Sequence, residues 1–146
     1  MSEIKIRRMN PGDLETVTIL CGQLGYPTEE ETTAKRFLKI NTDFKQTVFV
    51  AENQNEEVVG YIHAKETVSF LFDLRVEICS LVVDDQCRGK GVGSLLMKQI
   101  DLWAKERGLN TIHFTSQAKR TDAHKLYQRL GYEITKTSHW FKKVID

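Results

Sequence analysis

The first third of the chain predicts one short strand followed by two helices. Ile4–Arg7 alternates apolar and polar residues, as a half-buried strand does. A helix is expected to open at Asn10 and to stop at Gly25. Its apolar residues recur at spacings of three and four: Leu14, Val17, Leu20, Cys21 and Leu24. Thr28 and Glu31 form the pattern of a capping box, which predicts a second helix carrying Ala34, Phe37, Leu38 and Ile40.

The middle of the chain predicts three strands. Val48–Ala51 and Val58–Phe72 are rich in strand-forming residues and flank the polar turn at 53–55, so they are expected to form a hairpin. Val76–Val83 is a further strand. Its last three residues are all apolar, which favours a buried position with both faces covered.

The last third predicts two helices and three strands. A helix is expected from Gly91 to Arg107, a strand over Thr111–Thr115, and a helix that Asp122 caps and Gly131 ends. Tyr132–Ile134 and Trp140–Val144 are expected to be closing strands. The predicted order is βααβββαβαββ, an α/β (α+β) fold with helices on both faces of a mixed central sheet.

Composition narrows the class of protein. The 146 residues match one domain, expected to span 1–146. Lys and Arg number 21 against 20 Asp and Glu, without a basic stripe, so no nucleic-acid partner is expected. No apolar run is long enough for a membrane span, and the first ten residues lack the apolar core of a signal peptide. We therefore expect a soluble, cytoplasmic protein.

The three cysteines are Cys21, Cys79 and Cys87. Their odd number, without a C-x-x-C pair or a histidine at zinc spacing, predicts free thiols and no metal site. Cys87 lies in a glycine-rich loop, where a reactive thiol is the less favoured alternative.

That loop is the most informative part of the chain. Three alternate glycines, Gly89, Gly91 and Gly93, separate the strand at Val76–Val83 from a long helix. Glycines allow close approach of a ligand to the backbone, and a helix N-terminus adds unpaired N–H donors, so the segment predicts a phosphate site. The spacing fits neither a dinucleotide fingerprint nor a Walker A loop. A glycine-rich helix entry without a ligand is the alternative.

Two motifs resemble those of the GNAT superfamily of N-acetyltransferases. Gln86-x-x-Gly89-x-Gly91 matches the family pattern Q/R-x-x-G-x-G/A. The run from Ala123 to Tyr132 matches A-x-x-[FL]-Y-x-x-x-G-[FY]. The resemblance covers almost the whole chain and implies the GNAT fold, with a sheet splayed between strands 4 and 5, and acetyl-CoA as cosubstrate.

The resemblance also implies how the coenzyme is held. In the family, amides of the loop cradle the pyrophosphate, here those of Arg88, Gly89, Lys90, Gly91, Val92, Gly93 and Ser94. The end of the fourth strand pairs with the pantetheine arm, here at Leu81 and Val83. An amide at or near Val82 polarises the thioester carbonyl, which agrees with the general efficiency of backbone donors aimed at an oxyanion.

Two side chains are candidates for proton transfer. Tyr127 occupies the position of the family's general acid, with a core aromatic as the alternative. Glu77 is the candidate base that deprotonates the amine, with a solvated carboxylate as the alternative. Glu29–Glu31, Glu66 and Asp73 are expected near the acceptor entrance, where they would attract a cationic amine; for Glu29–Glu31 a role at the helix dipole is favoured.

The predicted activity is acetyl transfer from acetyl-CoA to a primary amine of a small molecule, by direct attack in a ternary complex. The alternatives are a protein or peptide N-acetyltransferase and a non-catalytic CoA-binding module. Residues 116–127 resemble the variant motif of aminoalkylphosphonate N-acetyltransferases, in which Arg120 is either a substrate-anion or a structural residue. His124 is favoured as a packing or capping residue. The sequence leaves the oligomeric state open, with a homodimer as one alternative.

Overall fold

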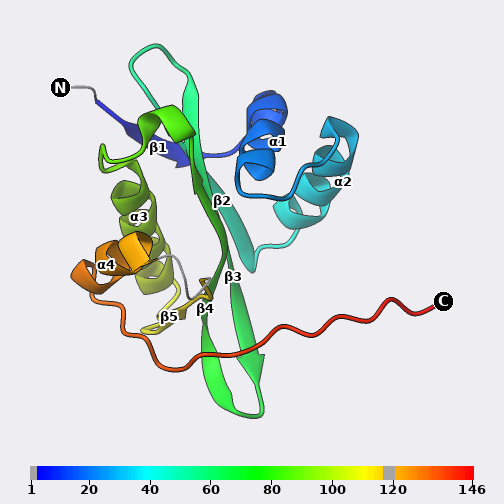
Figure 1. Ribbon diagram of the computed structural model, residues 1–146, viewed down its shortest axis with the longest axis vertical. Coiled ribbons are helices and arrows are strands. Elements are labelled where there is room, and N and C mark those ends of the chain that lie inside the picture. The colour runs from blue at the N-terminus through cyan, green and yellow to red at the C-terminus, as the bar shows by residue number, and fades with distance from the viewer. Residues whose placement is uncertain (1–2, 117–120) are drawn as a thin grey trace. The chain divides into compact units, whose positions relative to one another are not determined.

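The computed structural model describes residues 3–116 and 121–146, without the side chains of residues 121 and 122. The chain divides into two compact parts, Met1–Phe114 and Thr115–Asp146. The first part contains a mixed sheet with helices on both faces (Figure 1). The predicted fold class is therefore confirmed.

The sheet has the strand order β1-β2-β3-β4-β5. Strands β1 to β5 span Lys5–Arg8, Gln46–Glu52, Val58–Ser69, Phe72–Val83 and Ile112–His113. Neighbours from β1 to β4 are antiparallel, and β5 is parallel to β4. The helices are η1 (Pro11–Asp13), α1 (Leu14–Gln23), α2 (Glu30–Asn41), η2 (Asp85–Cys87), α3 (Val92–Glu106) and α4 (Thr121–Arg129). None of the helices in the described part of the chain is long and apolar enough to cross a membrane.

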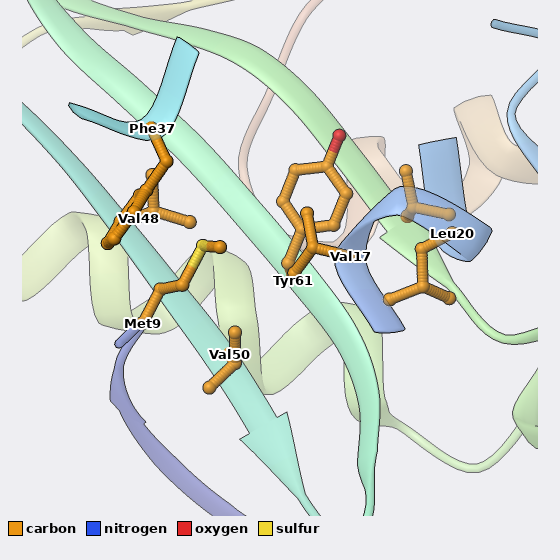
Figure 2. Packing of buried hydrophobic residues seen from close by; sticks show 8 residues of the cluster. Met9, Val17, Leu20, Phe37, Val48, Val50 and Tyr61 are labelled. Carbon is orange, nitrogen blue, oxygen red and sulfur yellow. The ribbon is translucent and has the colours of Figure 1, made fainter. Parts of the chain in front are cut away.

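The two faces of the sheet follow from the alternation of side chains along β3. Tyr61 packs with Val17 and Leu20 of α1, on the face that also receives α2 (Figure 2). Gly60 faces α3, since a Cβ there would lie 3.3 Å from side-chain atoms of Val92 and Leu96. The missing side chain lets α3 pack close to β3.

The start of the α1 region is held by a capping box and an ion pair. The Asn10 side chain accepts from Gly12 N, and Asp13 accepts from the Asn10 N–H at 2.9 Å. Arg7 donates to both oxygens of Asp13, at 2.8 and 2.9 Å, and also contacts Glu52. Burial raises the pKa of Asp13, but the hydrogen bonds from Arg7 and the Asn10 amide outweigh it and leave the pKa below its usual value.

The sheet opens between β4 and β5. Only Val76 and Glu77 of β4 pair with β5, opposite Ile112 and His113. Strand β4 continues to Val83, so the part of β4 that follows these pairs has no β5 neighbour. The predicted splay between the fourth and fifth strands is confirmed.

Two predicted turns or caps differ from the structure. The capping box at Thr28 is wrong, because α2 begins at Glu30 and Glu29 occupies its N-cap without a side-chain hydrogen bond. Strand β3 ends at Ser69, which pairs with Phe72, so the turn lies at residues 70–71 rather than beyond Phe72. The sequence does not reveal this turn, because its residues Phe70 and Leu71 are apolar and continue the strand pattern. Both side chains are exposed at the tip of the hairpin.

The two closing strands are also absent. Residues 132–146 form no strand, although Tyr132–Ile134 and Trp140–Val144 are apolar enough to suggest one. Their apolar side chains are largely exposed, with Trp140 and Phe141 at 83% and 94%. Apolar content indicates a strand only where a neighbouring strand supplies backbone partners and a buried face.

Candidate functional site

The glycine-rich loop has the backbone geometry that only glycine adopts easily. Gly89 and Gly91 have φ angles of 78° and 83°, in the left-handed region. Gly91 is the N-cap of α3. Gly93 has an ordinary helical conformation, and a Cβ there would touch only Val83 Cγ2, at 3.7 Å. The loop therefore brings its backbone amides to the N-terminus of a 15-residue helix, where anions bind favourably.

The entry to this loop is anchored to α1. Asp84 accepts from Gln86 N at 3.1 Å and caps η2. Asp85 N donates to Gln23 Oε1 of α1 at 2.9 Å. Arg88 forms an exposed ion pair with Asp85 at 2.9 Å. Such a surface pair contributes little stability, so a phosphate can replace the carboxylate at small cost.

The end of β4 runs from the splay to this loop. Val82 is buried in the core cluster with Tyr61, whereas Leu81 and Val83 are half-buried. All three pair with β3 on one side. The other side of β4 has no β5 neighbour at this level, which leaves room for an extended ligand to add to the sheet edge.

Glu77 lies where the splay begins. It is half-buried, opposite Lys65 of β3 and His113 of β5 in the strand register. A β-bulge follows, because Ile78 and Ser80 pair with consecutive residues of β3 while Cys79 has no partner. Cys79 is exposed, but partial desolvation and the nearby Glu77 charge raise the pKa of its thiol to about 11, so this thiol stays protonated at neutral pH.

A polar network that sequence patterns did not indicate lies on the α1 face of β3 and β4. Ser80 Oγ donates to Tyr61 Oη at 3.0 Å, and Tyr61 Oη lies 3.4 Å from Cys21 Sγ. Burial raises the pKa of Tyr61 far above its usual value, so its hydroxyl stays neutral. Pairing of β3 with β4 and packing of α1 on the sheet bring these three residues together, which a single sequence does not reveal.

Two acidic residues expected at the acceptor entrance lie on different faces of the sheet. Glu66 forms an ion pair with Arg107, which follows α3. Lys65, the residue before Glu66, lies on the α1 side with Glu77, so strand alternation places Glu66 on the opposite face. That Glu66 borders the acceptor stays a prediction. Glu29–Glu31 and Asp73 are exposed.

Tyr127 and His124 lie on α4, in the second part of the chain. Their ring centroids are 6.3 Å apart, and His124 Nε2 lies 3.2 Å from Ser116 Oγ. The packing or capping role of His124 stays a prediction. Arg120 and the side chain of Asp122 lie outside the described residues. The described residues contain no group of three or more His, Cys, Asp or Glu side chains that could hold a metal.

The family model described as the acetyltransferase (GNAT) family matches residues 14–132. This range includes both motifs, the glycine loop and α4. The chain therefore belongs to the GNAT family of acetyltransferases.

Individual relatives are distant. An uncharacterized N-acetyltransferase YhdJ of Bacillus subtilis (strain 168) is 35% identical over 69 residues, or 47% of each chain. The aminoalkylphosphonate N-acetyltransferase of Salmonella typhimurium (strain LT2) is 28% identical over 150 residues, which cover 96% of this chain and 90% of that protein. The chain thus spans about half the length of the first of these relatives and most of the second.

A solved structure supports the fold. The aminoglycoside N-acetyltransferase AAC(6′)-Iy in complex with CoA superimposes with a TM-score of 0.85 at 22% identity, covering 98% of this chain and 96% of that one. At this identity the similarity shows the fold alone.

Proposed function

We propose that the protein transfers an acetyl group from acetyl-CoA to a primary amine of a small molecule, by direct attack in a ternary complex. The observation that carries the proposal is the continuous path from the open edge of β4 into the glycine loop and the N-terminus of α3. A pantetheine arm fits the open edge of β4, and a pyrophosphate fits the glycine loop at the N-terminus of α3. Family membership and the CoA bound by AAC(6′)-Iy support the same ligand.

In this proposal the loop amides from Arg88 to Ser94 hold the pyrophosphate. The backbone of Leu81 and Val83 holds the pantetheine amides. The Val82 amide, or one beside it, donates to the thioester oxygen as negative charge develops there. These backbone donors are held in place by the strand and the helix, so little reorganisation is needed during the reaction.

The chemistry requires three proton transfers. An alkylamine is mostly protonated at neutral pH and must lose a proton before its nitrogen can attack the thioester carbon. Glu77, directly or through a water, accepts that proton. The attack leaves the nitrogen positively charged, and the C–S bond then breaks as the carbonyl re-forms. Tyr127 donates a proton to the leaving thiolate, and the nitrogen releases its second proton through water to the Tyr127 phenolate. The products are the N-acetylated amine and CoA with a free thiol.

The acceptor is proposed to be a small molecule because two relatives that align along most of the chain act on such amines. They are the aminoalkylphosphonate N-acetyltransferase and AAC(6′)-Iy. A peptide acceptor remains the alternative. The single-domain organisation, a cytoplasmic location and a homodimer stay predictions.

An amine panel with acetyl-CoA, read by release of the CoA thiol, tests the proposal. Amine-dependent thiol release is expected for at least one small amine. Gly91→Asp is the binding-site control, because it adds strain and negative charge where the pyrophosphate is expected. Its CoA affinity should fall at least tenfold, about 1.4 kcal/mol, while the fold survives. CoA binding without amine-dependent release would instead favour a non-catalytic module.

A further inference from the structure

We propose that the Ser80 hydroxyl of β4 accepts a hydrogen bond from an N–H of the acceptor amine and so orients the amine nitrogen toward the thioester carbon. Tyr61 is the positioning residue of this arrangement, because it takes the hydrogen bond that Ser80 donates and leaves the Ser80 lone pairs to the amine. The inference rests on the proposed function, since it adds an orienting residue to the same site.

The bulge at Cys79 places Ser80 on the same face of β4 as Glu77. Before the bulge Glu77 pairs with Lys65, and after it Ser80 pairs with His63. These two partners are two residues, or about 6.6 Å, apart on one face of β3. Without the extra residue, Ser80 would stand three positions after Glu77 and would lie on the opposite face. Bulges that re-aim a side chain in this way are common beside active sites.

The hydrogen bonds behind Ser80 have an order that leaves its oxygen as an acceptor. Ser80 Oγ donates to Tyr61 Oη at 3.0 Å, and Tyr61 Oη lies 3.4 Å from Cys21 Sγ of α1. A hydroxyl has one proton and two lone pairs. Because Ser80 uses its proton on Tyr61, any further partner of the Ser80 oxygen must be a donor. An amine N–H is such a donor, whereas a thioester oxygen is not.

Tyr61 directs the Ser80 hydroxyl but does not take part in proton transfer. Its ring is buried beside Val17 and Leu20 of α1 (Figure 2). Burial raises the pKa of Tyr61 far above its usual value, so the hydroxyl stays neutral. A neutral phenol is too weak a base to accept the amine proton. The network therefore orients the amine, and Glu77 remains the base.

Ser80 lies where an amine at Glu77 would meet the thioester. In the described part of the chain, β5 pairs with β4 only at Val76 and Glu77. Ser80 follows this opening of the sheet and is half-buried. It directly precedes Leu81, whose backbone is proposed to hold the pantetheine arm. An amine that moves from Glu77 toward the thioester therefore passes Ser80.

A hydrogen bond to Ser80 would restrict the amine at the moment of attack. A primary amine that has given its extra proton to Glu77 keeps two N–H bonds and a lone pair. Once Ser80 holds one N–H, rotation about the C–N bond no longer turns the lone pair away from the thioester carbon, and such orientation lowers the barrier. The nitrogen becomes positive as it attacks, and charged donors form stronger hydrogen bonds. Loss of the Ser80 hydroxyl should therefore lower kcat.

Steady-state thiol release with a responsive amine tests the inference. Ser80→Ala should lower kcat roughly 10-fold, as loss of a hydrogen bond to a charged group does, with little change in the KM for acetyl-CoA. Ser80→Thr keeps the hydroxyl and should restore most of the rate. Tyr61→Phe keeps the buried ring but no longer accepts the Ser80 proton, and should lower kcat roughly threefold, as loss of a neutral hydrogen bond does.

A double variant and a matched control separate orientation from stability. Because Tyr61 acts through Ser80, the variant that combines Ser80→Ala with Tyr61→Phe should be no slower than Ser80→Ala alone. Thr47→Val is the control, since Thr47 carries a buried hydroxyl on the opposite face of the sheet, 3.2 Å from Arg8 Nη1. It should lower the unfolding free energy without changing kcat.

The outcomes distinguish this role from a purely structural one and from failure of the proposed function. Unchanged kcat in either single variant, with only the unfolding free energy lowered, would overturn the orienting role while acetyl transfer stands. Additive losses in the double variant would also overturn it, because Ser80 would then not depend on Tyr61. So would a Tyr61→Phe variant faster than wild type, because Ser80 would then act as a donor. If the wild-type protein acetylates no amine, the proposed function itself fails, and no amine is left for Ser80 to orient.

Discussion

Gly93 offers a sharp test of the loop, because nothing in the protein itself requires a glycine there. Its backbone is helical, unlike that of Gly89 and Gly91, and an added Cβ would meet only Val83 Cγ2 at an ordinary 3.7 Å. Glycine near the start of a helix costs stability relative to alanine. A ligand that approaches the Gly93 amide closely would explain why the larger residue is absent.

The expected magnitudes follow from this geometry. Gly93→Ala should stabilise the fold by about 0.5 kcal/mol, the lower end of the helix-interior value, which raises Tm by roughly 1–2 °C in a chain of this size. Gly91→Ala should instead cost about 1–2 kcal/mol, because its φ of 83° is strained for any residue with a Cβ. Both variants should weaken CoA binding at least tenfold, about 1.4 kcal/mol.

Thermal unfolding and CoA calorimetry on the same samples provide the assay. Gly22→Ala is the matched control, since Gly22 lies in α1 and a Cβ there would meet nothing within 4 Å. It should raise Tm similarly without changing CoA affinity. A stabilised Gly93→Ala variant that binds CoA as tightly as wild type would refute the idea that the pyrophosphate lies against this amide.

Four further outcomes are expected. Tyr127→Phe should lower kcat roughly 100-fold with little change in the KM for acetyl-CoA, measured by steady-state thiol release; wild-type turnover would make Tyr127 a packing residue. Glu77→Gln should lower kcat/KM at neutral pH and recover part of it as pH rises, because more amine is already neutral; an unchanged pH–rate profile would exclude Glu77 as the base. Burial and the charge of Lys65 lower the pKa of His63 in the folded protein to about 4. As pH falls, His63 therefore takes up a proton in the unfolded chain at a higher pH than in the folded protein. The unfolding free energy, measured in denaturant titrations, should then drop by about 3 kcal/mol between pH 6.5 and 4. His63→Gln should reduce this pH dependence; an unchanged pH dependence in the variant would show that His63 is not its cause. Asp13→Asn should lower the unfolding free energy by about 2 kcal/mol, less than a fully buried pair because Arg7 is partly exposed; unaltered denaturant stability would contradict the role of this pair.

Local patterns predicted most of the first part of the chain. The helical spacing of Leu14, Val17 and Leu20 and the glycines at Gly25 and Gly91 mark real element boundaries, since each reflects a constraint within a few residues. The cap of α2 and the turn of the β3–β4 hairpin were misplaced. At both places two neighbouring positions are almost equally suitable for the cap or the turn, so the spacing of residues in the sequence could not decide which is used.

Long-range register accounts for what the sequence could not provide. The loop glycines could be found because they are contiguous, whereas the placement of Glu66 on the far face depends on its register in β3. The stacking of Arg75 on Phe72 and the Ser80–Tyr61 contact likewise depend on pairings and turns between strands. The prediction of two closing strands was wrong for the same reason, because the apolar residues of these segments carry no information about a neighbouring strand to pair with.

The fate of the acetyl group tests the central claim most directly. Acetyl-CoA labelled with ¹³C at the acetyl carbonyl would be incubated with the protein and a responsive amine, and the carbonyl followed by NMR alongside thiol release. We predict that the label appears in an N-acetyl amide at the rate at which thiol is released. Label that appears as free acetate, or that stays in acetyl-CoA while the coenzyme is bound, would contradict transfer to an amine.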